Sequence, residues 1–217
     1  MKNKYMLLRW SFLFLLTPSF MQGQNLSAKV FFNTDSIPCT YLGIDFTLAR
    51  LVGDNESVSS VITTTQFNGI NDLIVKEFKK YDVQEAYRRI NWTVDLKEVE
   101  ARNLKADPDS LKSTNENSLY RLNDNDISQL VQNFNYGGHK GYGVLLIVEG
   151  MSKSAKIATV WFTLIDMNSK KLLFTAREQG KLGSGFGFRN YWASAIKNAI
   201  KNARDDYDKW QTGVVSK

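Results

Sequence analysis

Cysteine and histidine are almost absent from this chain, which contains one of each, Cys39 and His139. One cysteine cannot form a disulfide within the chain, and the pair cannot supply the ligand set of a common zinc site. A Cys–His nucleophilic pair is still arithmetically open. However, neither a helix start nor a basic cluster lies beside Cys39 to lower its pKa. We therefore expect a small half-buried cysteine and a surface histidine.

The sequence also has no apolar run of the roughly 20 residues that a spanning helix needs. Its N-terminus has three basic residues before a short apolar stretch that a proline interrupts (Lys2, Lys4, Arg9, Trp10–Leu16, Pro18, Phe20). This order is typical of a secretory signal. We expect residues 1–23 to be a signal peptide and the mature chain to begin near Gln24.

A lipid anchor on Cys39 is the alternative, but Ser36-Ile37-Pro38 lacks the small residues that a lipobox places directly before its cysteine. The formal charge is +6, and it falls to +3 without the three basic residues of the signal. So weak a basic balance does not indicate nucleic acid. We expect an exported protein, periplasmic or envelope-associated, of a Gram-negative bacterium, with no transmembrane segment in the mature chain.

Residues 24–217 have the length of a single α+β domain. Three apolar runs follow one another between Gly143 and Lys181, and in the middle one Ala158 to Ile165 alternates with period two. The turn residues 166–171 between the second and third runs favour a hairpin. We predict a mixed sheet with a C-terminal three-stranded antiparallel meander and with helices packed on it.

Other segments show weaker patterns. We expect strands over 29–32, 41–46 and 91–99, and helices over 67–81, 82–90 and 124–134. In the first helix, Phe67, Ile70, Ile74, Phe78 and Tyr81 share the apolar face. Residues 103–123 are polar and predict a loop or an insertion. A long C-terminal helix carries its apolar stripe from Trp192 to Trp210, and alanines at 195, 199 and 203 let it lie close to the sheet.

This order of elements resembles the α/β domain of the curli-assembly protein CsgG and the TolB N-terminal domain. The resemblance rests on the strand 143–148, the turn 166–171 and the alanine-bearing helix. It implies an envelope-associated, non-catalytic domain. The chain lacks a lipobox and membrane-spanning hairpins, so the resemblance transfers neither pore formation nor any functional residue.

Candidate chemistry is sparse. The glycines at 183, 185 and 187 follow a meander strand and match neither a dinucleotide fingerprint nor a phosphate loop, so we predict no cofactor and no metal. A hydrolase would need two facing carboxylates. Asp45, Glu149 and Asp166 are candidates that the sequence does not rank.

Aromatic residues crowd the glycine-rich crossover, where Phe186, Phe188 and Tyr191 accompany Arg189. Such a set is typical of a partner-binding surface, although a phenylalanine could instead plug the core. Ser36 and Ser110 each follow an aspartate and precede an apolar residue, as in some O-glycosylation motifs. The leading hypothesis is an exported cell-envelope binding or assembly module without catalytic activity, whose partner is an envelope protein or polymer. A hydrolase acting on envelope polymers is the alternative.

Overall fold

The computed structural model describes residues 26–215, so the expected signal peptide lies outside the described residues. It combines helices with one mixed sheet and ends in a long helix, which confirms the α+β class. The strands are β1 (Cys39–Asp45), β2 (Arg50–Val52), β3 (Trp92–Val94), β4 (Lys112–Ser113), β5 (Tyr142–Ser152), β6 (Ile157–Asp166) and β7 (Lys171–Lys181). The helices are α1 (Ala28–Asn33), α2 (Ser59–Val61), the π-helix η1 (Ile62–Gln66), α3 (Phe67–Lys76), α4 (Val83–Ala86), α5 (Lys97–Asn103), the 3₁₀-helix η2 (Glu116–Tyr120), α6 (Asp124–Asn133) and α7 (Gly187–Val215).

β5 is the longest central strand, and β1 and β2 follow one another along the same side of it. β3 pairs with β1 and β4 with β2, and all four of these pairings are parallel. On the other side of β5, β6 and then β7 pair in antiparallel succession. The described sheet therefore has two outer borders, one formed by β3 and β4 and the other by β7.

These pairings confirm the predicted antiparallel pairing of β5, β6 and β7. They also correct the prediction that this meander is the main part of the sheet. Four of the six strand pairings are parallel, so the sheet as a whole is largely parallel and the three C-terminal strands are only part of it. Parallel partners need not be near in sequence, and Cys39 pairs opposite Tyr142. For that reason the alternation of apolar residues within single strands did not predict the parallel pairings of β1, β2, β3 and β4.

A bulge between Tyr41 and Ile44 bends β1. Gly43 has a φ of +96° there, and a β-carbon would lie 2.6 Å from Val99 Cγ1. The side chain of Asn71 secures the bulge, because it accepts from the Ile44 amide at 2.7 Å and donates to the Ile44 carbonyl at 2.9 Å. The bulge thus fixes how β1 faces α3.

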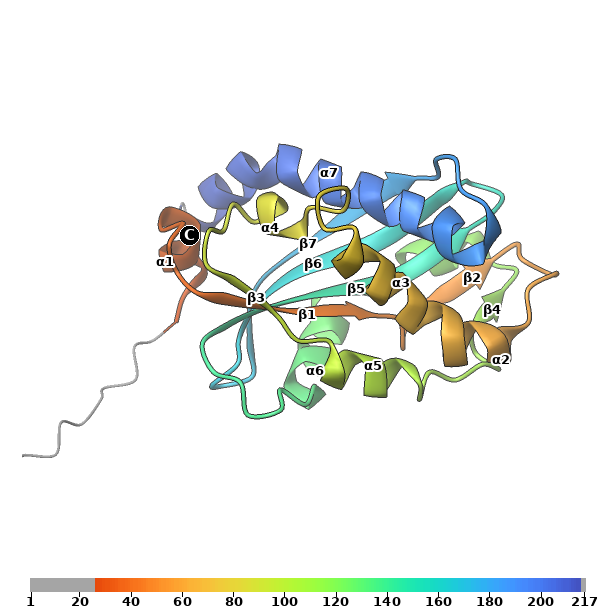
Figure 1. The fold of residues 1–217 in the computed structure, drawn as a ribbon, viewed down its shortest axis with the longest axis horizontal. Helices are drawn as coiled ribbons and strands as arrows, with labels where there is room; N and C mark the ends of the chain where they lie inside the picture. Colours follow the sequence, from red (N-terminus) through yellow and green to blue (C-terminus); the bar gives the residue numbers. More distant parts are fainter. Residues whose placement is uncertain (1–25, 216–217) are drawn as a thin grey trace, which may run out of the picture.

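Helices cover both faces of the sheet (Figure 1). One face carries α7, α3, α4 and α1 with the larger apolar cluster, and the opposite face carries α6 and the Val99 side of α5. β6 is accordingly buried on both faces, where the sequence indicated a wholly apolar face and a mixed one. Trp161 and Ile165 fill the core beneath the sheet because α6 packs there.

Close packing of α7 on the sheet depends on small residues, as predicted. Ala195, Ala199 and Ala203 are fully buried along α7. Opposite them, a β-carbon on Gly180 of β7 would lie 1.8 Å from the Ala195 carbonyl oxygen and 2.6 Å from the Ala199 amide nitrogen. The helix and the strand therefore meet backbone to backbone at this point.

Several local predictions were wrong. Residues 29–32 belong to α1, because Ser27 accepts a hydrogen bond from the Val30 amide and starts a helix. The predicted strand 91–99 ends at Val94, and α5 begins at Lys97. Segment 103–123, expected as a polar loop, contains β4 and η2 and anchors itself through buried Leu111, Leu119 and Leu122.

The helix predicted over residues 67–81 also ends earlier than its apolar pattern indicated. α3 stops at Lys76, and Glu77 leaves the helical conformation with φ −102° and ψ 41°. Phe78, expected on the buried face, is consequently 61% exposed. This places an aromatic ring at the surface beside β3.

Candidate functional site

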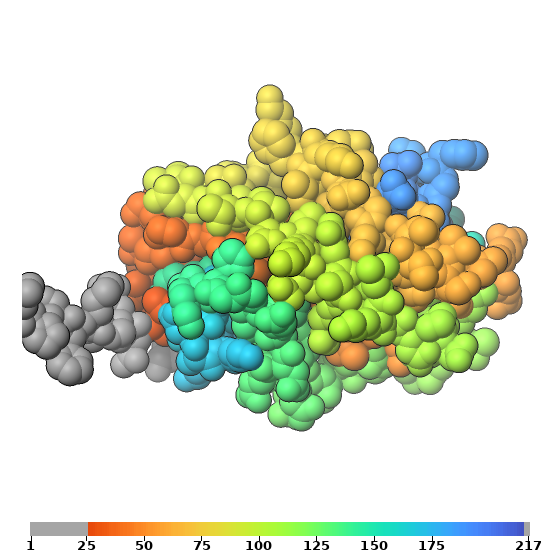
Figure 2. Space-filling view, turned by 60° about the horizontal axis from the view of Figure 1, so that its bottom comes forward, coloured from red at the N-terminus to blue at the C-terminus, as the bar shows by residue number. Residues whose placement is uncertain are grey.

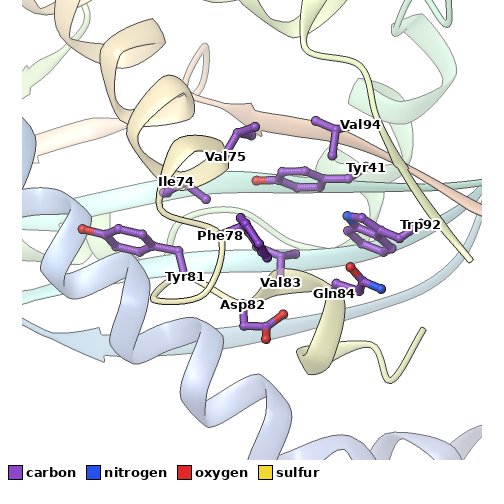
Figure 3. A pocket seen from close by; sticks show the side chains of 10 residues that line it. All are labelled: Tyr41, Ile74, Val75, Phe78, Tyr81, Asp82, Val83, Gln84, Trp92 and Val94. Carbon is purple, nitrogen blue, oxygen red and sulfur yellow. The ribbon is translucent and has the colours of Figure 1, made fainter. Parts of the chain in front are cut away.

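A cavity of about 210 Å³ lies between α3, α4 and the outer border formed by β3 (Figure 3). Apolar and aromatic side chains form most of its lining, which consists of Tyr41, Ile74, Val75, Phe78, Tyr81, Asp82, Val83, Gln84, Trp92 and Val94. We refer to it as the Tyr41 cavity. Ligand sites are usually concave and mostly apolar, with a few polar groups that orient the ligand.

The ring of Tyr41 is the floor of this cavity. It is 2% exposed, and it stacks on Trp92 with centroids 5.7 Å apart and an interplanar angle of 19°. In Figure 3 the ring extends from β1 toward the α3 side of the cavity. Its hydroxyl is buried and has no hydrogen-bond partner among residues 26–215. Burial raises the pKa of this phenol, so the hydroxyl stays protonated and can donate.

An unpaired buried hydroxyl costs free energy, typically about 1–3 kcal/mol, unless something satisfies it. Two other polar side chains of the lining have partners elsewhere in the protein. Asp82 accepts from the Glu85 amide at 2.9 Å, and the Gln84 amide group donates to the Arg89 carbonyl at 2.8 Å. The Tyr41 hydroxyl is thus a buried, unpaired polar group of this lining that a ligand could engage.

The rim of the Tyr41 cavity is apolar and open to solvent. Phe78 and Val94 belong to the lining and are 61% and 45% exposed, and Ile90, two residues before β3, is 66% exposed. Figure 2 shows the surface on this side of the molecule, where the yellow-green segment that contains β3 reaches the surface. Exposed apolar side chains gathered in one place often mark a binding surface.

A second cavity of about 690 Å³ touches the same border. It is lined by Leu26, Val30, Ile37, Pro38, Cys39, Thr40, Thr93, Lys140, Gly141 and Tyr142. Trp92 and Val94 line the first cavity, whereas Thr93 between them lines the second. Since successive strand residues point to opposite faces, β3 has one cavity on each face.

The residues predicted at the glycine-rich crossover are also brought to the surface. Phe186 is 95% exposed, Arg189 is exposed, and Phe188 and Tyr191 are half-buried against Trp192. Arg189 lies over Gly69 of α3, where a β-carbon would come within 2.4 Å of its guanidinium. Phe186 therefore does not plug the core, while Phe188 and Tyr191 border another cavity of about 440 Å³.

The three carboxylates proposed for a hydrolase each have their own partners. Asp45 pairs with Arg102 and accepts from Thr47, and Asp166 accepts from Asn168 and Ser169 within its turn. Glu149 lies 2.9 Å from Arg177 and accepts from the Trp161 indole at 3.0 Å. Burial raises the pKa of Glu149, and the Leu122 amide and Arg177 oppose that rise. Each of the three carboxylates is therefore engaged in its own structural contacts.

Cys39 and His139 likewise do not form the pair that the sequence left open. Cys39 is fully buried, not half-buried, and burial raises the pKa of its thiol, with Arg89 opposing. His139 forms a hydrogen bond between its Nε2 and Asp95 Oδ2 at 2.7 Å. This bond lowers the pKa of Asp95. Within residues 26–215, no three His, Cys, Asp or Glu side chains gather as a metal site.

Comparisons with known proteins give little further guidance. No protein-family model and no curated protein matches the chain. Among solved structures, one described as "a putative lipoprotein from Caulobacter crescentus CB15" aligns at 14% identity over 41% of this chain and 80% of its own, with a TM-score of 0.23. A likeness of that size carries no argument about fold or function. These comparisons show no link to CsgG or to TolB.

Sequence reasoning missed the Tyr41 cavity. Tyr41, Ile74 and Trp92 were each assigned to a regular element, but nothing in the pattern placed them together. The available signal was the cluster of aromatic and apolar residues at 78, 90, 92 and 94 around a short strand. It could be interpreted only once β3 was known to lie at the border of the sheet.

Proposed function

We propose that the protein is an exported, non-catalytic binding module of the cell envelope that holds an extended segment of a partner chain along β3. The observation that carries the proposal is the unpaired Tyr41 hydroxyl in an apolar cavity directly beside an open strand. Addition of a strand to a sheet border is a common mode of peptide recognition, in which main-chain hydrogen bonds give affinity and pockets for alternate side chains give specificity.

The register of β3 supports this mode. The Cys39 amide donates to the Asn91 carbonyl at 3.1 Å, and the Asp95 amide donates to the Tyr41 carbonyl at 3.0 Å. In a parallel ladder with this register, residues 91, 93 and 95 direct their backbone groups to β1. The N–H and C=O groups of Trp92 and Val94 therefore face outward, where an incoming strand would bond them.

The two cavities supply the side-chain part of the recognition. Alternate residues of an incoming strand would point to opposite faces of the sheet, as those of β3 do. One set would meet the Tyr41 cavity, where an apolar side chain fits and an acceptor oxygen would accept a hydrogen bond from the Tyr41 hydroxyl. The other set would meet the wider cavity beside Thr93, whose lining includes the polar Thr40 and Lys140.

The envelope location belongs to the same proposal. It rests on the signal-like pattern of residues 1–23, and none of the helices between residues 26 and 215 has the length and apolar character to cross a membrane. Intact-mass measurement of the exported form should give a chain that starts near Gln24. A membrane-retained chain with residues 1–23 still attached would contradict export by signal cleavage.

Two further surface features remain proposals. We propose a second contact surface that consists of Phe186, Phe188, Arg189 and Tyr191, and the exposure of Phe186 supports it.

Ser36 is exposed and Ser110 is half-buried, and both remain proposed O-glycosylation sites. Peptide mass mapping of the exported protein tests them, and unmodified peptides at both serines would contradict the proposal.

A model peptide tests strand addition. The probe is an acetylated and amidated octapeptide in which leucine alternates with threonine between two terminal lysines, and the readout is the ¹H–¹⁵N spectrum of the protein. We expect saturable shifts at the amides of Trp92 and Val94. The matched control is the same peptide N-methylated at every residue between the two lysines, which keeps every side chain and removes the main-chain donors along both edges of that segment. Equal binding of both peptides, or shifts confined to another face, would contradict the proposal.

A further inference from the structure

We propose that the cavity at the start of α7 is a separate binding site for a small aromatic carboxylate. It lies far along the chain from β3, between the segment after β2, the β5–β6 turn and the crossover into α7. Its lining consists of Ser57, Lys153, Gly185, Gly187, Phe188, Tyr191 and Trp192, and its volume is about 440 Å³. Figure 2 shows the blue crossover standing out from the surface beside the orange segment that contains α2.

One polar side-chain group of this lining, on Trp192, is a donor without an acceptor, whereas Ser57 and Lys153 are paired with Asp54. The indole Nε1 of Trp192 is buried and has no hydrogen-bond partner among residues 26–215, although the side chain borders the cavity. An indole N–H can only donate. Such a group, left unpaired in the interior, indicates a missing acceptor.

The start of α7 adds further donors. α7 runs for 29 residues from Gly187, and the first four N–H groups of any α-helix have no partner within it. No side chain of residues 26–215 accepts a hydrogen bond from the backbone amides of residues 187–190. The positive end of the helix dipole lies at the same place, and it favours a negative charge.

Lys153 of the lining is shared by two carboxylates. Its ammonium lies 3.0 Å from Asp54 and 3.6 Å from Glu56. Asp54 is also satisfied by the Ser57 amide at 2.9 Å and by the Ser57 hydroxyl at 2.7 Å. The buried Asp54 carboxylate is thus ion-paired and hydrogen-bonded, which leaves the donors of Trp192 and α7 to select the ligand.

The aromatic rings of the lining indicate that the apolar part of the ligand is flat. Tyr191 lies edge-to-face against Trp192 with centroids 5.3 Å apart, and the Phe188 ring lies 6.3 Å from the Trp192 ring. Phe188 and Tyr191 are only half-buried, so they can gain contact with a flat apolar body. A phenyl ring on a short chain that ends in a carboxylate matches both parts of the cavity.

Titration with 3-phenylpropionate tests the site, using ¹⁵N-labelled mature protein. We expect a saturable downfield shift of the Trp192 indole N–H signal. The cationic counterpart, 3-phenylpropylammonium, should not bind, because it offers donors where an acceptor is needed. Equal binding of the cation, or an unmoved Trp192 signal while phenylpropionate is present in excess, would overturn the proposal. Neither outcome depends on whether a variant folds.

Trp192→Phe is the sharpest variant because it removes the N–H and keeps an aromatic ring. Since hydrogen bonds to a charged group contribute about 1.5–3 kcal/mol, the affinity for 3-phenylpropionate should fall at least tenfold. Trp92→Phe, the matched change in the Tyr41 cavity, should leave this affinity unchanged. Undiminished binding by Trp192→Phe would overturn the proposal, and the octapeptide that tests β3 should bind this variant as it binds the wild type.

Discussion

β3 and β7 lie at opposite borders of the sheet, and the molecule covers their outward backbone groups differently. In the hydrogen-bonding register of β6 and β7, the carbonyls of Gln179 and Lys181 point away from β6. Asn202 and Asn198 of α7 donate to these two carbonyls, each at 2.7 Å. No side chain of residues 26–215 does the same for Trp92 or Val94 of β3.

This difference matters because the unpaired N–H and C=O groups of a border strand can pair with another chain, and proteins usually cover or protect them. α7 covers the C-terminal half of β7. The N-terminal half of β7 lines a cavity of about 860 Å³ beside Trp210. β3 is short, carries a cavity on each face and remains uncovered. A covered border stabilises the fold, whereas an uncovered one is available for binding. The expected effects of substitutions should follow this division.

The largest effect on stability should come from Arg177 of β7. Its Nε lies 2.9 Å from Glu149, and its guanidinium stacks over Trp161 at 4.4 Å. Arg177→Met would leave the buried Glu149 carboxylate without a cation, so the free energy of unfolding should fall by about 3 kcal/mol. Urea denaturation measures it. Lys171→Met, at the exposed start of the same strand, should change it by less than about 0.5 kcal/mol, and a similar small change for Arg177→Met would contradict this account.

Overpacking the contact between α7 and β7 should have the next largest effect. Ala199 is fully buried where the helix meets Gly180, so Ala199→Leu should lower the free energy of unfolding by about 1–3 kcal/mol. Lys201→Ala on the exposed side should change it by less than about 0.5 kcal/mol. Equal melting temperatures of the two variants would show that α7 does not press on β7 at this point.

Glu178 makes the covered border sensitive to pH. Burial and repulsion from Asp206 raise the pKa of Glu178 to about 7, and Lys209 opposes the rise. Because the folded state holds this proton more tightly than the unfolded state, stability falls as pH rises from about 4.5 to 7. Glu178→Gln should abolish this part of the slope and, since the group is partly exposed, raise stability at pH 8 by about 1–2 kcal/mol. Parallel melting curves of variant and wild type across pH 5–8 would refute the prediction.

Long periodic segments made the covered border predictable from the sequence. The alanines at 195, 199 and 203 and the alternation from Ala158 to Ile165 repeat often enough to identify α7 and β6. Their contact was inferred correctly, because small residues facing a strand have a direct steric meaning. The exposure of Phe186 was one of two alternatives that the sequence left open, and the structure decides for it.

The β3 border was not predictable in the same way. β3 has three residues, too few for a period, and its partner β1 lies about fifty residues earlier in the chain. Phe78 was assigned to the core because its spacing fits α3, yet the helix ends at Lys76 with no glycine or proline to signal the stop. The Tyr41 cavity depends on that early end, on the Gly43 bulge and on parallel pairing, none of which a local pattern contains.

Substitution of Val94 tests the central claim most directly. Val94→Pro removes the outward N–H of β3 but no hydrogen bond to β1, and a border strand tolerates proline in that position. Val94→Thr has nearly the same shape and keeps the N–H, so it is the matched control. Both variants should fold like the wild type by circular dichroism. We predict that Val94→Thr still binds the leucine–threonine octapeptide, whereas Val94→Pro loses at least tenfold in affinity; undiminished binding by a folded Val94→Pro would contradict strand addition at β3.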